Sequence, residues 1–401
     1  MLLVPRPATA AISAGPTIDL PWMQYVNDFA AVTAAVLADG SFAIAGTEAF
    51  QPTPQEITER LQAQFFRASG AAQTPPVVLR PPGGVGAAGV GSVGSRYFLV
   101  WEGRGGAHAA FYSQQGALLG QPFPWPISDI PEFAAHYRFG DAPLWRFLPI
   151  TFTSAGLFEG YPYYRTLLRA AQPNGHLLGS PVELAPQALT FFEDAAINGS
   201  GRFVVVSDQC SLADPGLPCI RGMQMFDGAV TPRTPLVSAE VPQDESPGGV
   251  GNSSVRAAIG AQGQVLLTWF TDEQLPVPRY VARLYDRDGS PASDEVPVVT
   301  PAVLDLSPIR EVKALDDGSF VLSWLLYTQV DHMATLFVVR FDPQTKSFEE
   351  PVALAEGSMA GALLELNGAG RGVIVWQTEE SNADGNVIAK EGHLRVIRVN
   401  R

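Results

Sequence analysis

Charged residues are scarce in this 401-residue sequence, and basic residues are the scarcer kind. Only 16% of the residues are charged, and 26 Lys and Arg stand against 40 Asp and Glu, which gives a formal net charge of -14. A nucleic-acid backbone or an anionic membrane surface would repel such a protein at long range. We therefore expect neither as its main partner, and no nucleic-acid binding.

Long apolar runs are also missing. No stretch of about 18 uninterrupted apolar residues occurs, so we expect no membrane-spanning helix. The first residues have an apolar character and an Ala-rich end, as signal peptides do, but Pro5 and Pro7 interrupt them and no basic residue precedes them. The sequence leaves the presence of a signal peptide open.

Cysteine is limited to Cys210 and Cys219, which lie in the two arms of an expected hairpin. If the two strands pair, the cysteines face each other within reach of a disulfide bond. Structural disulfides are uncommon in the cytosol, so the pair favours an extracytoplasmic location: periplasmic, cell-surface or secreted. Two unrelated free thiols near a loop are the alternative.

Glycine and proline, by contrast, are abundant. The chain has 39 Gly and 34 Pro without a collagen-like period, and 46% of its residues are hydrophobic. Many turns joining short elements, with enough apolar material for a large core, are typical of an all-β protein.

A unit of four expected strands recurs along the chain. Its clearest copy spans Val255–Phe270, Tyr280–Gly289 and Asp294–Val299. In order, it has a strand rich in small residues, a turn, an apolar strand ending in Trp, an alternating strand and a Pro-led strand. Small side chains suit an innermost strand, because sheets that converge on a central axis crowd one another there. Such a recurring four-strand unit predicts a β-propeller.

Seven copies of the unit fit the chain, so the predicted fold is all-β: a seven-bladed β-propeller of four-stranded antiparallel blades, forming a single domain over residues 1–401. The expected blades are approximately 31–79, 85–125, 132–184, 189–239, 253–299, 309–354 and 358–400.

The seventh copy has no residues left for an outer strand, and the segment before the first copy matches that strand in pattern. We therefore expect an N-terminal strand at 15–20 to close the last blade, with Thr17–Leu20 beside His393–Asn400, because an open ring would leave unpaired sheet edges.

A tryptophan ends the apolar strand in four copies: Trp101, Trp269, Trp324 and Trp376. This fixed place favours packing between neighbouring blades over a role as ligand platforms, because a large ring contributes heavily when it is buried. Copies one, three and four lack this tryptophan.

The string DGSFVLSW…VVRFDPQT…EEPVAL resembles the propeller repeats of secreted and cell-surface bacterial proteins, whose blades read DG-x-F-V-V-x-W, then R-F-D, then a Gly-bearing turn and E-F-x-V. The resemblance covers nearly the whole chain and is strongest in copies five to seven. It implies architecture rather than activity.

Two groups of residues are candidates for function. Loops on a rigid scaffold carry function, and propeller ligands sit on the face that holds the loops between second and third strands. On that face, copies two and three gather an expected ligand patch: Trp125, Asp129, Phe158, Glu159, Tyr161 and Tyr163. The expected innermost strands carry residues that would line an axial channel: His136, Glu193, Asp194, Arg256, Arg310 and Lys313. Ordinary loop packing and solvated channel walls are the respective structural alternatives.

Metal and catalytic motifs are not evident. Asp286–Ser290 and Asn382–Asn386 resemble the start of a calcium loop, but the acidic residue needed at its far end is not at the right place. The histidines show no metal-ligand spacing, and no nucleophile elbow, phosphate loop or zinc motif occurs. We expect no cofactor and no metal, with calcium as the alternative, and we assign no catalytic residue.

The sequence thus predicts a non-catalytic binding or interaction propeller, exported by a bacterium, that recognises a protein or a glycan through loops on one face. One alternative is a polysaccharide hydrolase or lyase with acidic residues at the axial mouth as general acid and base. Another is a purely structural module of a larger surface assembly.

Overall fold

The computed structural model of the chain describes residues 12–25, 32–53, 56–79, 88–103, 106–124, 136–138, 148–158, 161–171, 177–184, 188–211, 220–228, 230–235, 237–238, 255–271, 279–298, 306–327, 333–382 and 387–400. These residues form β-strands and the short 3-10 helix η1 (Pro21–Tyr25). No helix in these ranges is long and apolar enough to cross a membrane.

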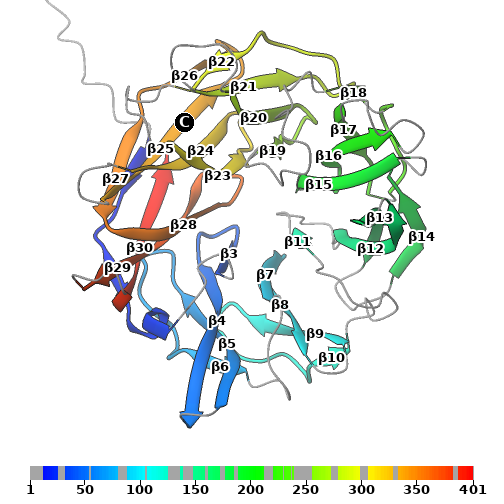
Figure 1. Ribbon diagram of the computed structural model, residues 1–401. Helices are drawn as coiled ribbons and strands as arrows, with labels where there is room; N and C mark the ends of the chain where they lie inside the picture. The colour runs from blue at the N-terminus through cyan, green and yellow to red at the C-terminus, as the bar shows by residue number, and fades with distance from the viewer. Residues whose placement is uncertain are drawn as a thin grey trace, which may run out of the picture.

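The strands of the described residues pair into seven antiparallel sheets, which follow one another around a ring (Figure 1). Sheet one has β3 (Thr33–Val36), β4 (Phe42–Thr53), β5 (Glu56–Phe66) and β6 (Val77–Leu79). Sheet two has β7 (Ala88–Val93), β8 (Arg96–Gly103), β9 (Gly106–Ser113) and β10 (Phe123–Pro124). Sheet three has β11 (His136–Arg138), β12 (Leu148–Phe158), β13 (Tyr161–Ala171) and β14 (Leu177–Glu183).

The remaining sheets continue this order. Sheet four has β15 (Ala188–Ile197), β16 (Phe203–Ser211), β17 (Ile220–Phe226) and β18 (Val237–Ser238). Sheet five has β19 (Arg256–Ile259), β20 (Val265–Thr271), β21 (Arg279–Tyr285) and β22 (Val296–Pro297). Sheet six has β23 (Leu306–Ala314), β24 (Phe320–Tyr327), β25 (Ala334–Asp342), β26 (Ser347–Phe348) and β27 (Val352–Gly357). Sheet seven has β28 (Met359–Leu366), β29 (Arg371–Ser381) and β30 (Val387–Val399), joined by β1 (Ile12–Ala14) and β2 (Ile18–Leu20).

The prediction of an all-β propeller with four-stranded antiparallel blades is confirmed. The small-residue segments form the innermost strands, such as β3, β15 and β19, which surround the centre of the ring in Figure 1. The Pro-led segments contribute the short outer strands, among them β6 and β22. Within a sheet, consecutive strands pair with each other because short turns join antiparallel neighbours, except that β27 pairs with β25 and that β1 and β2 both pair with β30.

The N-terminal segment completes sheet seven, as predicted. In β2, Ile18 pairs with Leu394 and Leu20 pairs with Gly392 of β30. The strand β1, which was not expected, extends the same edge by pairing Ile12 with Val399. Sheet seven therefore holds the chain's first and last strands side by side.

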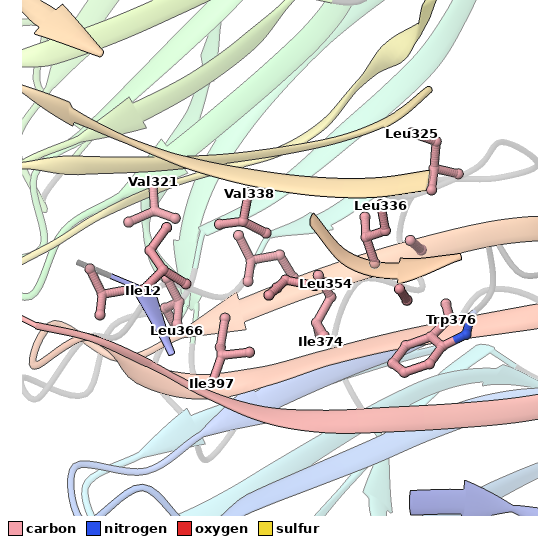
Figure 2. Close-up of a cluster of buried hydrophobic side chains, with 14 of the residues drawn as sticks. Ile12, Val321, Leu325, Leu336, Val338, Leu354, Leu366, Ile374, Trp376 and Ile397 are labelled. Carbon is pink, nitrogen blue, oxygen red and sulfur yellow. The ribbon is translucent and has the colours of Figure 1, made fainter. Parts of the chain in front are cut away.

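Apolar side chains fill the space between sheets six and seven. Figure 2 shows Ile12 of β1 beside Leu366 and Ile397, facing Val321 and Val338 of sheet six. The N-terminal strand thus buries a side chain in the core as well as pairing its main chain.

The tryptophans pack between blades, as the sequence predicts. Trp269 and Trp324 are fully buried, and Trp101 and Trp376 are 5% and 4% exposed. Each belongs to a core cluster shared with the preceding sheet: Trp269, for example, lies with Val204 and Val206 of sheet four. Burial of these rings supplies much of the driving force for docking one blade on the next.

The disulfide between Cys210 and Cys219 is not supported. No disulfide bond joins residues that the structure describes. Cys210 lies in β16 opposite Leu189, and Cys219 lies outside the described residues. The described pairing of β16 with β17 ends at Gln209 and Ile220, which are the residues next to Cys210 and Cys219.

Buried asparagines tie first turns of neighbouring sheets together. Asn198 Nδ2 donates to the carbonyl of Gly260 at 2.8 Å, and Asn367 Nδ2 donates to the carbonyl of Leu37 at 2.7 Å. The second bond joins sheet seven to sheet one across 330 residues of sequence. Both asparagines are 4 to 5% exposed, so each bond satisfies polar groups that water does not reach.

Replacing Asn367 by Ala should lower the free energy of unfolding by about 1–3 kcal/mol, because the Leu37 carbonyl and the turn amides at Ala369 and Arg371 lose their partner. The matched Asn198→Ala change should lower the free energy of unfolding by a similar amount. Urea unfolding measures both. A loss below about 0.5 kcal/mol for Asn367→Ala would contradict the assigned role.

Alkaline pH should destabilise the junction of sheets one and two. Burial raises the pKa of Tyr112 from 10.0 to about 12, so the folded state keeps this phenol protonated where the unfolded chain ionises. The free energy of unfolding should therefore fall as pH rises from about 10 toward 12. We expect Tyr112→Phe to lose less stability than the unmodified protein over this window, and parallel pH profiles would contradict the assignment.

Candidate functional site

The predicted axial residues all lie on innermost strands. His136 is in β11, Glu193 and Asp194 are in β15, Arg256 is in β19, and Arg310 and Lys313 are in β23. The structure describes the side chains of Asp194, Arg256 and Lys313. These three are engaged in contacts close to the strands that carry them.

Asp194 connects sheet four to sheet five. Its side chain is 3% exposed, and Oδ2 accepts a hydrogen bond from the Ala257 amide of β19 at 3.0 Å. Thr33 does the same between sheets one and two, since its Oγ1 accepts from the Val90 amide of β7 at 3.1 Å. Both residues directly precede an Ala-Ala pair, so they hold the same place in the repeat.

Lys313 connects sheet six to sheet seven. Its Nζ lies 2.6 Å from Glu365 Oε2 of β28 and 3.7 Å from Glu311 Oε2 of its own strand. The three side chains are 15 to 22% exposed, so solvent screens the charges only partly. One ammonium placed between two carboxylates is an arrangement that stabilises a blade junction.

Arg256 holds the repeat position of Asp194 and Thr33 in sheet five. Its Nη1 donates to the carbonyl of Val255 at 2.9 Å. The described axial groups thus make contacts within and between sheets. Acid–base chemistry would need a group positioned toward substrate instead.

The predicted ligand patch is only partly described. Phe158 ends β12, and Tyr161 and Tyr163 lie in β13, where Tyr161 pairs with Phe158 and Tyr163 pairs with Gly156. Strand pairing therefore brings these three residues to the tip of one hairpin. Trp125, Asp129 and Glu159 lie outside the described residues.

The first calcium candidate, Asp286–Ser290, forms a tight turn. Asp288 Oδ1 accepts from the hydroxyl and amide of Ser290 at 2.6 and 3.0 Å, and these hydrogen bonds lower the pKa of Asp288. Gly289 adopts a φ of 86°, which glycine tolerates. Of the second candidate, residues 383–386 lie outside the described residues. No group of three or more metal-binding side chains occurs within the described ranges.

A polar notch of about 600 Å³ lies beside that turn. It is lined by Gln262, Gln264, Asp286, Arg287 and Asp288. It opens at the end of sheet five opposite the β20–β21 loop, and the side chains that line it are all polar. No pattern in the sequence associates Gln262 and Gln264 with this turn.

Sheet seven contains a hydrogen-bonded group of three side chains that the sequence did not predict. His393 Nδ1 lies 3.0 Å from Asp19 Oδ1, and His393 Nε2 lies 3.1 Å from Thr378 Oγ1. The His393 ring also contacts Trp376, with ring centroids 5.4 Å apart. The order carboxylate, imidazole, hydroxyl is that of a hydrolase triad. Here it joins β2, β30 and β29, so it ties the closing strand to its blade. The predicted pairing of Thr17–Leu20 with His393–Asn400 was the available signal, but it did not specify which side chains meet.

No known protein family and no curated protein matches the sequence of this chain. Solved structures do match in fold. Polysaccharide lyase Uly1 aligns with a TM-score of 0.52 and 8% identity, over 94% of this chain and 91% of that one. The chain shares the β-propeller fold. An ulvan lyase of family PL25 aligns with a TM-score of 0.49 and 10% identity, over 89% of this chain and 90% of that one. The propeller domain of the Trilobed protease from Pyrococcus furiosus has a TM-score of 0.48 and 10% identity, over 90% and 91%. At such identities the likeness shows the fold alone.

Replacing Asp194 by Ala should lower the free energy of unfolding by about 1–3 kcal/mol, because the buried Ala257 amide loses its acceptor. Asp194→Thr should cost less, since Thr33 performs the same task in sheet one. Urea unfolding of the two variants tests this. Equal losses for Ala and Thr would show that an acceptor at this position is not what matters.

Proposed function

We propose that this protein is a binding or interaction propeller, exported from the cell, which recognises a protein or a glycan through one face of the ring. Three long hairpins on that face carry the proposal. Their strands have 12 and 11 residues in β4–β5, 11 and 11 in β12–β13, and 11 and 13 in β29–β30. The matching strands of sheet five have 7 each.

Strand pairing continues to the ends of these hairpins. Thr53 pairs with Glu56, Phe158 pairs with Tyr161, and Ser381 pairs with Val387. A paired ladder holds its two strands in register up to these last pairs, and such order in the free protein reduces the entropy lost when a partner binds. These features support three arms that present a preformed surface.

We further propose that each of the seven sheets is one blade of a single closed ring. Contacts between innermost strands of consecutive sheets support this at six junctions: β3 with β7, β11 with β15, β15 with β19, β19 with β23, β23 with β28, and β28 with β3. The resemblance of the repeats to secreted bacterial propellers supports export.

Action on a polysaccharide is the second candidate function. Its support is the fold shared with a polysaccharide lyase. The described axial carboxylates Asp194, Glu311 and Glu365 do not add to that support, because they make contacts at blade junctions. Incubation with a panel of polysaccharides distinguishes the two functions. A lyase releases unsaturated products that absorb ultraviolet light, whereas a binding protein leaves the chains intact.

The arms are tested with a matched pair of surface substitutions. Val387, at the tip of β29–β30, is 45% exposed, and Leu118, in the turn between β9 and β10 at the opposite end of the strands, is 43% exposed. Binding would be measured on a glycan array, and the affinity for the best glycan determined by titration. We expect Val387→Ser to weaken binding about fivefold or more, which is about 1 kcal/mol, and Leu118→Ser to leave it unchanged. Equal weakening by both, or weakening by Leu118→Ser alone, would refute a binding surface on the arms.

A further inference from the structure

In sheets five, six and seven, the blade tryptophan has a fixed distance from the first turn of its sheet. A glycine with positive φ in that turn precedes it by six residues, from Gly263 to Trp269, from Gly318 to Trp324 and from Gly370 to Trp376. Sheet one has the same turn at Gly40, with a φ of 90°, but the residue six positions later is Gly46. Sheet one therefore lacks the ring that docks sheets two, five, six and seven on the sheet before them.

Trp22 of η1 occupies the space at Gly46. A Cβ atom placed on Gly46 would lie 3.5 Å from Cζ3 and 3.6 Å from Cη2 of Trp22. These are van der Waals distances, so a methyl group at position 46 would touch the indole, and a bulky side chain that points the same way would compete with it for space. Trp22 is 7% exposed and belongs to the core cluster that sheets one and seven share, with Ile44 and Val375.

Polar contacts fix η1 to both sheets. Trp22 Nε1 donates to Gln64 Oε1 of β5 at 2.9 Å, and Gln377 Nε2 of β29 donates to the Met23 carbonyl at 2.8 Å. A Cβ at Gly392 of β30 would overlap the fully buried Met23. The same short helix is thus bound to sheet one and sheet seven at once.

We propose that residues 12–25 form a latch that locks the ring, in which Trp22 replaces the blade tryptophan that sheet one lacks. The strands β1 and β2 attach the latch to sheet seven, and Trp22 inserts between sheets seven and one. In sheets two, five, six and seven the second strand supplies this ring. At the junction of the last and first blades, the ring comes from the segment that closes the circle.

The decisive experiment transfers the tryptophan back to its repeat position. Trp22→Ala should lower the thermal midpoint by on the order of 5 °C or more, because a buried indole is lost. Adding Gly46→Trp to this variant should restore at least half of the loss. Gly46→Trp alone should be destabilising, since two indoles compete for one space. A double variant no more stable than Trp22→Ala, or a single Gly46→Trp variant as stable as the unmodified protein, would overturn the proposal.

Hydrogen exchange provides a second readout that does not require Gly46→Trp to fold. Trp22→Ala should accelerate amide exchange where β2 pairs with β30 and in β4, while exchange around β19 and β20 remains unchanged. The control Trp269→Ala should show the reverse pattern. Uniform acceleration by Trp22→Ala across the described sheets would mean that Trp22 supports the core in general and is not a latch.

Discussion

Sheets one, four, five, six and seven each contribute to two buried apolar clusters, one with each adjacent sheet, so each needs a neighbour on both sides. Burial of the blade tryptophans satisfies this need where sheets two, five, six and seven dock on the sheet before them. The first and last sheets can satisfy it only by meeting each other. Ring closure is therefore a hydrophobic necessity, and the N-terminal segment meets it with two strands, Trp22 and Met23.

The docking of sheets on one another also explains the hydrogen bonds of polar side chains near the axis. Innermost strands of adjacent blades approach closely, and their buried amides and carbonyls need partners that the strand ladder does not provide. Asp194 and Thr33 accept from the next blade, and Asn198 and Asn367 donate to it. Asp194, which the sequence alone places among candidate channel residues, thus also makes a contact that joins two sheets.

The latch and the arms are physically connected. Met23 contacts Gly392 and Gln377, which lie in the β29–β30 hairpin, and Trp22 lies against Gly46 where the β4–β5 hairpin begins to extend. Two of the three long hairpins therefore share one support at their base. The relay of Asp19, His393 and Thr378 adds a polar connection between the closing strand and the same hairpin.

The sequence alone determined the strand order, the small-residue inner strands, the burial of four tryptophans and the pairing of the N-terminal strand with β30, because each is a local pattern repeated at similar spacing. Only the tertiary structure decided which side chains meet. Trp22 reaches Gly46, His393 reaches Asp19, and Lys313 reaches Glu365 across large sequence separations. A repeat pattern specifies what each blade contains, but contacts between blades depend on how the sheets twist and dock, and no single copy of the repeat encodes that.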